Sequence, residues 1–434
     1  MLTLTHRYRI YPDVTQEQMI VEWMEICRSA FNYALREIKD WCDSRKCLVD
    51  RCSLEKEYIL PPDLKFPSVI QQLNNLPRAK KEFPRLAEVP SQVLQQAIKQ
   101  LHRGWEYFQK RGFCFPRFKK YGQMKSLLFP QFKENPVTNL HIKLPKIGNI
   151  PINLHRPIPS GFALKQVRII RQADVWYASI SLQCEVSVPD PMPYGHPIGI
   201  DIGLEKFLAT SDGTLVRPPK FFKQLQSRLK VLQRRLSRKQ KRSKNYEKQR
   251  IKVARLHHQI DNTRKDFHYK QAHVLTKAPV CDAGDMVFME DLDYRVSAKG
   301  RLGKQMLDAA FGQFRIIVQY VCWKRGKFCR ASTLARFANG VVDAHGTSQQ
   351  CPECGGEVKK DLSVRVHDCP HCQFKTDRDV AAGLNIRNRG LNLISTLGHS
   401  GMQTACADVL PGIELAQSRQ VSKSPRGKTR KSSK

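Results

Sequence analysis

The first residues of the chain alternate between apolar and polar side chains. The residues of one parity are Leu2, Leu4, His6, Tyr8 and Ile10. This period of two predicts a half-buried β-strand that ends at Pro12. From about residue 15 to residue 110 the apolar residues recur every three or four positions, apart from the proline-containing stretch 58–90. That spacing predicts a lobe of helices.

Alternation returns over residues 139–188. It is clearest at Trp176, Ala178, Ile180, Leu182, Cys184 and Val186. We expect a strand-rich lobe here, completed by the first strand of the chain. The closely spaced prolines of residues 189–193 disfavour both helix and sheet. They predict an extended linker, and a new domain begins near Gly195.

The domain after this linker mixes strands with helices. A buried strand at 198–203 leads into a hairpin with a Ser211–Gly213 turn. Leucines spaced by four, three and four residues then predict a long helix: Leu225, Leu229, Leu232 and Leu236. A strand at 286–290, a helix around 311–321 and a weaker strand near Val341 follow. This order predicts an α/β sheet of the kind found in nucleases.

Composition indicates the nature of the partner. The 434 residues correspond to roughly three domains, which excludes a small disulfide-stapled protein. Lysine and arginine total 74 against 39 acidic residues, so the formal net charge is +35. No apolar run is long enough for a signal peptide or a membrane span, so we expect no membrane partner and a cytoplasmic location. The polyanion that such a charge predicts is then nucleic acid.

Two basic segments are candidates for binding it. Residues 217–255 contain sixteen lysines and arginines and one acid, Glu247. Such a density favours contact with phosphates, although charge runs are more commonly solvated helix faces. The candidates in this segment are Arg234, Arg235, Arg238, Lys239, Lys241 and Arg242. In a second segment three basic residues are interleaved with aromatic residues that could stack on bases, the alternative being a core edge with solvated lysines. They are Arg117, Lys119 and Lys120.

Four of the fourteen cysteines form two Cys-x-x-Cys pairs separated by fourteen residues. They are Cys351, Cys354, Cys369 and Cys372. This spacing predicts a tetrahedral Zn²⁺ site. Four thiolates leave no open position, so the metal is expected to be structural, with the neighbouring His367 and His371 as bystanders. The other ten cysteines are unevenly spaced, as expected of reduced thiols.

Three carboxylates are candidates for a second metal site. Asp201 lies within an apolar strand, Glu290 ends another, and Asp379 begins the helix-like segment 379–386. An ionised side chain in an apolar strand needs a partner or a metal. The three could hold two Mg²⁺ ions that act on a phosphodiester. Salt bridges and, for Asp379, a helix N-cap are the alternatives.

In this order the motifs resemble those of the TnpB family, the transposon-encoded RNA-guided nucleases related to type V CRISPR effectors. The motifs are Arg7–Pro12, Phe115–Lys120, Gly199–Gly203, Met289–Leu292, Thr347–Gln349, the paired cysteines and Asp377–Asp379. The resemblance implies an α/β fold class with all-β and all-α lobes. The implied parts are a wedge-type β-barrel (1–14 and 111–192), a helical recognition lobe (15–110), an RNase H-like RuvC nuclease domain (195–350 and 376–392), an inserted zinc ribbon (351–375) and a basic, disordered tail (393–434).

The resemblance also implies roles for residues and partners. Asp201, Glu290 and Asp379, rather than Asp377, match the family's three Mg²⁺-binding catalytic carboxylates, and the paired cysteines match its zinc ligands. A guide RNA from the transposon end and a double-stranded DNA target would be the partners, with the protein reading a short motif beside the target. The implied activity is Mg²⁺-dependent, RNA-guided cleavage of DNA.

Two departures from the family pattern bear on that activity. Ala381 stands where the family commonly has asparagine, with Gly383 expected to add flexibility, and residues 329–340 fit neither a strand nor a helix. Two other functions therefore stay open: a guided DNA-binding regulator without catalysis, and a zinc-ribbon DNA-binding transposase accessory that uses no guide. The complete carboxylate set favours the nuclease.

Overall fold

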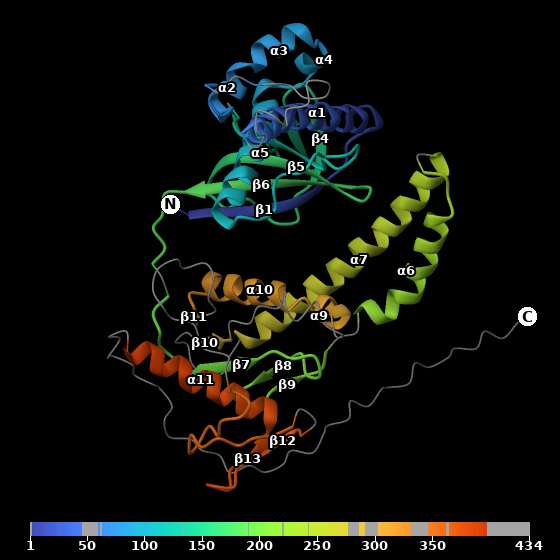
Figure 1. The fold of residues 1–434 in the computed structure, drawn as a ribbon. Helices are drawn as coiled ribbons and strands as arrows, with labels where there is room; N and C mark the ends of the chain where they lie inside the picture. Colours follow the sequence, from blue (N-terminus) through green and yellow to red (C-terminus); the bar gives the residue numbers. More distant parts are fainter. Residues whose placement is uncertain are drawn as a thin grey trace, which may run out of the picture. The chain divides into compact units, whose positions relative to one another are not determined.

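The computed structural model describes residues 2–45, 60, 63–132, 134–189, 191–218, 221–241, 243–276, 286–290, 303–330, 346–361 and 364–396. The chain forms two compact units (Figure 1). The first comprises Met1–Asp190 and Lys220–Lys265, and the second comprises Pro191–Pro219 and Asp266–Lys434. Within the described ranges, no helix combines the length and the apolarity that crossing a membrane requires.

The first unit contains a six-stranded sheet with the order β2-β5-β6-β1-β4-β3. Its strands are β1 (Leu2–Ile10), β2 (Ser126–Phe129), β3 (His141–Leu144), β4 (Gly148–Asn153), β5 (Ala163–Gln172) and β6 (Val175–Cys184). β1 pairs antiparallel with β6 along its whole length, from Leu2 opposite Cys184 to Ile10 opposite Trp176. The predicted pairing of the first strand with the strand-rich lobe is confirmed. Among the described residues the sheet does not close between β2 and β3, so it is a half-barrel.

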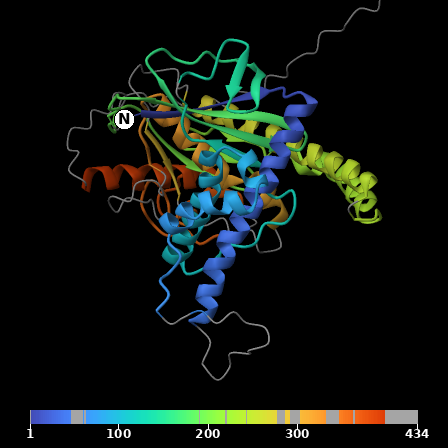
Figure 2. The same cartoon turned by 90° about the horizontal axis from the view of Figure 1, so that it is seen from above.

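The first unit contains the helical lobe expected between residues 15 and 110, including three short helices within the stretch 58–90, where the helical spacing is interrupted. The helices of this lobe are α1 (Val14–Ser44), α2 (Val69–Asn74), α3 (Leu76–Glu82), α4 (Arg85–Glu88) and α5 (Ser91–Arg111). α1 is one long continuous helix (Figure 2). The Asp13 carboxylate accepts the backbone N–H of Gln16 at 2.8 Å, and the Gln16 side chain accepts the N–H of Asp13 at 3.2 Å. This capping box explains why α1 begins where it does.

Two further helices, α6 (Phe221–Ser237) and α7 (Lys244–Leu275), form a hairpin (Figure 1). Leu229 of α6 packs against Leu256 and Ile260 of α7, on the leucine stripe that the spacing predicts. The Arg255 guanidinium of α7 donates to both carboxylate oxygens of Asp174, at 3.0 and 2.7 Å. Because Asp174 lies in the β5–β6 turn, this ion pair ties the hairpin to the sheet of the first unit.

The second unit is built on a five-stranded sheet with the order β11-β10-β7-β8-β9. Its strands are β7 (Pro197–Asp201), β8 (Leu208–Thr210), β9 (Leu215–Val216), β10 (Met286–Met289) and β11 (Cys329–Arg330). β10 runs parallel to both β7 and β11, and β8 and β9 continue the sheet antiparallel. The expectation of no strand in 329–340 is therefore wrong for its first two residues. Residues 331–340 and the expected strand near Val341 lie outside the described residues. The expectation of a disordered tail from residue 393 is wrong for its first four residues, because α11 continues to Thr396; the residues from 397 onward lie outside the described residues.

Helices cover both faces of this sheet. They are α9 (Gly303–Ala309), α10 (Phe311–Lys324) and α11 (Arg378–Thr396). Along β10, Val287 and Met289 pack in a cluster with α10, whereas Met286 and Phe288 pack in another with α11. Burial on both sides explains why this strand is apolar throughout. The predicted α/β class is confirmed for this unit.

Two glycines let α11 lie directly on β7. A Cβ atom at Gly199 would lie 2.0 Å from the carbonyl oxygen of Gly383 and 2.6 Å from the backbone nitrogen of Arg387. A Cβ atom at Gly383 would lie 2.9 Å from the backbone nitrogen of Ser211. Close approach, rather than the flexibility expected from the sequence, is thus the reason for glycine at position 383.

Gly199→Ala is expected to destabilise the second unit. The added methyl group meets backbone atoms that can move only if α11 shifts, and we expect a cost at the upper end of the ~1–3 kcal/mol typical of overpacking. Gly312→Ala on α10 is the matched control, because a Cβ atom there has no heavy atom within 4 Å; it should be neutral or stabilise by ~0.5–1 kcal/mol. Urea unfolding of both variants measures the difference, and equal midpoints would contradict the packing argument.

Candidate functional site

The three carboxylates predicted from the sequence gather in the second unit. Asp201 is the last residue of β7, and Glu290 follows β10 directly. Because β7 and β10 are parallel neighbours, with Ile200 opposite Met289, both residues lie at the carboxyl edge of the sheet, where open α/β sheets bind ligands. Asp379 lies in the first turn of α11, the helix that packs on β7.

The negative charges of these residues act on one another. Burial, followed by the charges of Glu290 and Asp379, raises the pKa of Asp201 to about 7, while the backbone of Ile202 and the charge of Arg378 act in the opposite direction. Positive charge placed beside Asp201 would favour the ionised form of its carboxyl at neutral pH. Carboxylate oxygens are the ligands that Mg²⁺ prefers, so the donor types suit such a cation. Among the described residues, however, the group whose ligand atoms come together closely enough to hold a metal ion is that of the four cysteines, and it does not include these three carboxylates.

A lysine supplies part of the positive charge. The Lys206 ammonium, in the β7–β8 loop, contacts the carboxylate of Asp377 and lies 3.3 Å from Oδ2 of Asp379. Asp377 also accepts the backbone N–H of Asp379 at 3.0 Å, which is the N-cap bond at the start of α11. The helix-cap interpretation considered for Asp379 therefore applies to Asp377. Sequence reasoning missed Lys206, because a lysine in a loop carries no local signal of its long-range partners.

Asp201→Asn should remove a pH-dependent destabilisation of the protein in magnesium-free buffer. A carboxyl whose pKa is raised by folding contributes stability below its unfolded pKa, and that contribution is lost as the pH rises to about 7. Because one pKa unit equals about 1.4 kcal/mol, the effect is on the order of a few kcal/mol. We expect Asp201→Asn to raise the melting temperature at pH 8 and to change it little at pH 4. An identical gain at both pH values would contradict this assignment.

A buried threonine contacts one of the three carboxylates. The Thr347 hydroxyl donates to Oε1 of Glu290 at 2.5 Å, and both residues are buried. Thr347 belongs to a motif that carries the family resemblance, but sequence reasoning assigned it no role. One local signal was available. Thr347 is a polar residue four positions before Cys351, and the zinc site does not require it as a ligand.

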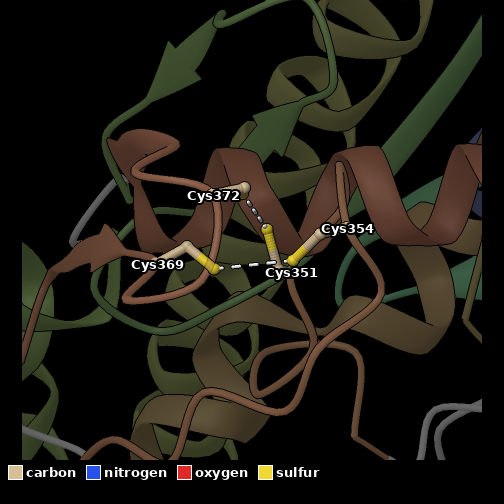
Figure 3. Close-up of side chains that lie close together, drawn as sticks. All are labelled: Cys351, Cys354, Cys369 and Cys372. Carbon is tan, nitrogen blue, oxygen red and sulfur yellow. Dashed lines mark hydrogen bonds between the residues drawn. The ribbon is translucent and has the colours of Figure 1, made fainter.

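The four paired cysteines converge on one point. Their Sγ atoms all lie within 4.8 Å of one another (Figure 3). The Sγ atoms of Cys351 and Cys372 are 3.6 Å apart, as are those of Cys354 and Cys369. This is the donor set of a structural zinc site with no open position. The described residues that could share a metal with these thiols include neither His367 nor His371.

Two similar tight turns present the thiols. The N–H of Gly355 donates to the carbonyl of Cys351, and the N–H of Gln373 donates to that of Cys369. Burial acts to raise the pKa of the Cys369 thiol. Hydrogen bonds from the backbone groups of Cys372 and His371 outweigh this effect, and the pKa is lowered to about 6. A thiolate is the form that binds metal. The short strands β12 (Val366–Asp368) and β13 (Lys375–Asp377) flank the second turn and pair antiparallel.

Some of the aromatic and basic residues around position 118 belong to the edge of the core, and others are exposed and available to nucleic acid. Phe115 packs against Trp105 and belongs to the core edge. Lys119 is half-buried, with Nζ 3.8 Å from the ring centre of Phe31. Arg117 and Lys120 are exposed, together with two of the aromatic residues, Phe118 and Tyr121. The structure therefore leaves only part of this segment available to nucleic acid.

Of the basic candidates in residues 217–255, two lie on α6 and the others follow its last residue, Ser237. Arg234, Arg235, Arg238 and Lys241 are exposed, Lys239 is partly exposed, and Arg242 lies outside the described residues. The apolar side of the same helix packs on α7. The hairpin thus presents a basic surface, and its contact with phosphates stays a prediction.

Three family models match segments of the chain. Their descriptions are "Probable transposase" for residues 181–292, "Helix-turn-helix domain" for residues 1–47 and "Cas12f1-like, TNB domain" for residues 311–386. In the second segment the structure has β1 followed by the single helix α1. The third segment runs from α10 through the four cysteines into α11.

Two curated relatives align with most of the chain. "Putative RNA-guided DNA endonuclease InsQ" of Escherichia coli (strain K12) is 30% identical over 402 residues, which cover 88% of this chain and 91% of the relative. "Putative RNA-guided DNA endonuclease" of Streptomyces pristinaespiralis is 29% identical over 395 residues, which cover 89% of each chain. The cryo-EM structure of the Cas12f1-sgRNA-target DNA complex aligns with 89% of this chain and 99% of that chain, at 13% identity and a TM-score of 0.45.

Proposed function

The chain belongs to the TnpB family, and on that premise we propose that it is an RNA-guided DNA endonuclease whose guide RNA comes from the transposon end. What supports the proposal most is the placement of Asp201 and Glu290 at the adjacent ends of β7 and β10, together with the effect of the Glu290 and Asp379 charges on the pKa of Asp201. A carboxyl whose pKa is raised by burial and by two neighbouring carboxylates suits the binding of divalent cations better than it suits a structural role.

We propose that these carboxylates bind Mg²⁺ and that they are the catalytic residues. Two Mg²⁺ ions in such a site supply an activated water molecule and stabilise the leaving oxygen of a phosphodiester. The contribution of the chain is to hold its ligands in place. The adjacent ends of β7 and β10 position Asp201 and Glu290, and the first turn of α11, capped by Asp377, positions Asp379.

Guide RNA and double-stranded target DNA are the partners that we propose. The exposed arginines of α6 and the exposed Arg117 and Lys120 would contact phosphates, so binding should weaken as the salt concentration rises. In guided nucleases, base pairing with the guide reads most of the target, and the protein reads a short adjacent motif. The four thiols would hold one Zn²⁺ as a structural ion.

The test is cleavage by the complex of the protein with its RNA. The chain is co-expressed with its native transposon end, purified, and mixed with a plasmid library that is randomised beside a guide-matched target, with or without Mg²⁺. Magnesium-dependent cuts beside one enriched motif are expected. Bound RNA and target binding without cuts would identify a guided regulator instead, and a preparation that binds DNA without RNA would identify a guide-independent accessory.

A further inference from the structure

The Glu290 carboxylate accepts a hydrogen bond from a residue that is not one of the three carboxylates. Its side chain is buried, and Oε1 accepts the 2.5 Å hydrogen bond from Thr347. Threonine is β-branched and has few side-chain rotamers, so its hydroxyl is a rigid donor. A donor fixed to one oxygen limits rotation of the carboxylate about its terminal bond. The direction in which Glu290 offers its lone pairs therefore depends on where Thr347 lies.

The position of Thr347 is set by a turn that leads into the cysteine cluster. The N–H groups of Gln349 and Gln350 both donate to the carbonyl of Gly346, at 3.0 and 3.1 Å, and Cys351 follows directly. One buried side chain holds both ends of this turn. Nδ2 of Asn385 donates to the carbonyls of Thr347 and Gln350, each at 2.7 Å.

Asn385 lies on α11, the helix whose first turn carries Asp379. Two other residues of α11 hold the same segment: Nδ2 of Asn388 donates to the carbonyl of Pro352 at 3.3 Å, and Arg389 donates to Oε1 of Gln350 at 3.0 Å. One helix therefore carries one carboxylate of the site and fixes the turn that orients another. The same helix also holds the residues on either side of Cys351, the first cysteine of the cluster.

We propose that Thr347 and Asn385 are positioning residues for metal binding by Glu290, and that through them the cysteine cluster supports the carboxylate site. The inference rests on the proposed function. Neighbours that orient a metal ligand are worth about 10–100-fold in metal affinity or activity. A hydroxyl that only fills space in the core would instead affect stability and leave metal affinity unchanged.

The principal variant is Thr347→Val, which keeps the shape of the side chain and removes the donor. Thr347→Ser restores the donor. Thr276→Val is the matched control, because its buried hydroxyl donates to the carbonyl of Ala272 at 2.9 Å in the same unit. Asn385→Leu, of similar volume, removes the donor that holds the turn around Thr347. It gives an independent result if Thr347→Val does not fold.

The readouts are Mn²⁺ binding measured by electron paramagnetic resonance, the rate of target cleavage as a function of Mg²⁺ concentration, zinc content and melting temperature. We expect Thr347→Val to weaken Mn²⁺ binding and to raise the Mg²⁺ concentration for half-maximal cleavage by about 10-fold or more. The Mn²⁺ affinity of Thr347→Ser should lie within about 3-fold of the wild-type value, and that of Thr276→Val should equal it. Asn385→Leu should weaken Mn²⁺ binding, as Thr347→Val does.

Wild-type Mn²⁺ affinity in both Thr347→Val and Asn385→Leu would overturn the inference. Asp201→Ala separates that outcome from failure of the proposed function. If Asp201→Ala is inactive while Thr347→Val behaves as the wild type, only the positioning role is rejected. If Asp201→Ala cuts as fast as the wild type, the carboxylate site is not catalytic and the inference is rejected with it.

Discussion

Asp201→Ala should bind guide RNA and target DNA as the wild type does and cut the target at least ~10³-fold more slowly, the size of loss expected when one member of a cooperative catalytic set is removed. The reason is that Asp201 lies at the end of β7, where burial and the charges of Glu290 and Asp379 act on it, and that it would be one of the ligands of Mg²⁺. Single-turnover cleavage and gel-shift binding, both at saturating Mg²⁺, measure the two properties separately.

Asp212→Ala provides the control for loss of a carboxylate in the same unit. Asp212 lies in the turn before β9, 3.0 Å from Nε2 of His196 and partly exposed. Its replacement is expected to leave cleavage within about 2-fold of the wild type, since partly exposed pairs contribute little. Undiminished cleavage by Asp201→Ala, or equal losses in the two variants, would reject the assignment of the carboxylate site.

Loss of the metal from the four cysteines is expected to have the second largest effect. Structural zinc contributes ~10–16 kcal/mol of binding free energy in small zinc domains, so Cys351→Ser should release the ion and unfold the segment 351–375. We also expect cleavage to fall by more than ~10-fold, because Cys351 directly follows the turn that orients Glu290. Elemental analysis should find about one zinc ion per wild-type chain and much less in the variant.

Cys114→Ser is the matched control for replacing a cysteine. Cys114 is exposed and lies outside the cluster, so zinc content, melting temperature and cleavage should all stay at wild-type values. If Cys351→Ser loses zinc and yet cuts DNA at the wild-type rate, the cluster serves stability alone. If the wild type contains no zinc when purified without chelators, the metal assignment is wrong.

Local signals were sufficient for the long strands and helices and for the cysteine site, but not for the short strand β11 or for α2, α3 and α4. The alternation of β1 is a direct consequence of having one buried face, and Cys-x-x-Cys pairs are short motifs whose chemistry depends little on the rest of the chain. The carboxylates were found because Asp201 and Glu290 are charged residues in or beside apolar strands. Their placement at one edge depends on β7 and β10 being parallel neighbours, a pairing that was not predicted from the sequence.

Features that depend on long-range contacts could not be predicted. Nothing near Arg255 indicates that its partner is Asp174, in a turn formed much earlier in the chain. Gly383 looked flexible because a glycine in a helix usually is, whereas its role comes from β7 lying against it. Lys119 looked like its exposed neighbours, but it lies over the ring of Phe31.

The place of β1 in its sheet has a consequence for synthesis of the protein. β1 is made well before its long partner β6, which ends at Cys184. At ~5–20 residues per second the ribosome needs on the order of 10–30 s to make the intervening chain. During that time the edges of β1 are not covered by β6, and a nascent strand with one apolar face is prone to wrong pairing. The first unit should therefore complete its folding late in translation, and slower elongation between β1 and β6 should increase the yield of aggregated chains.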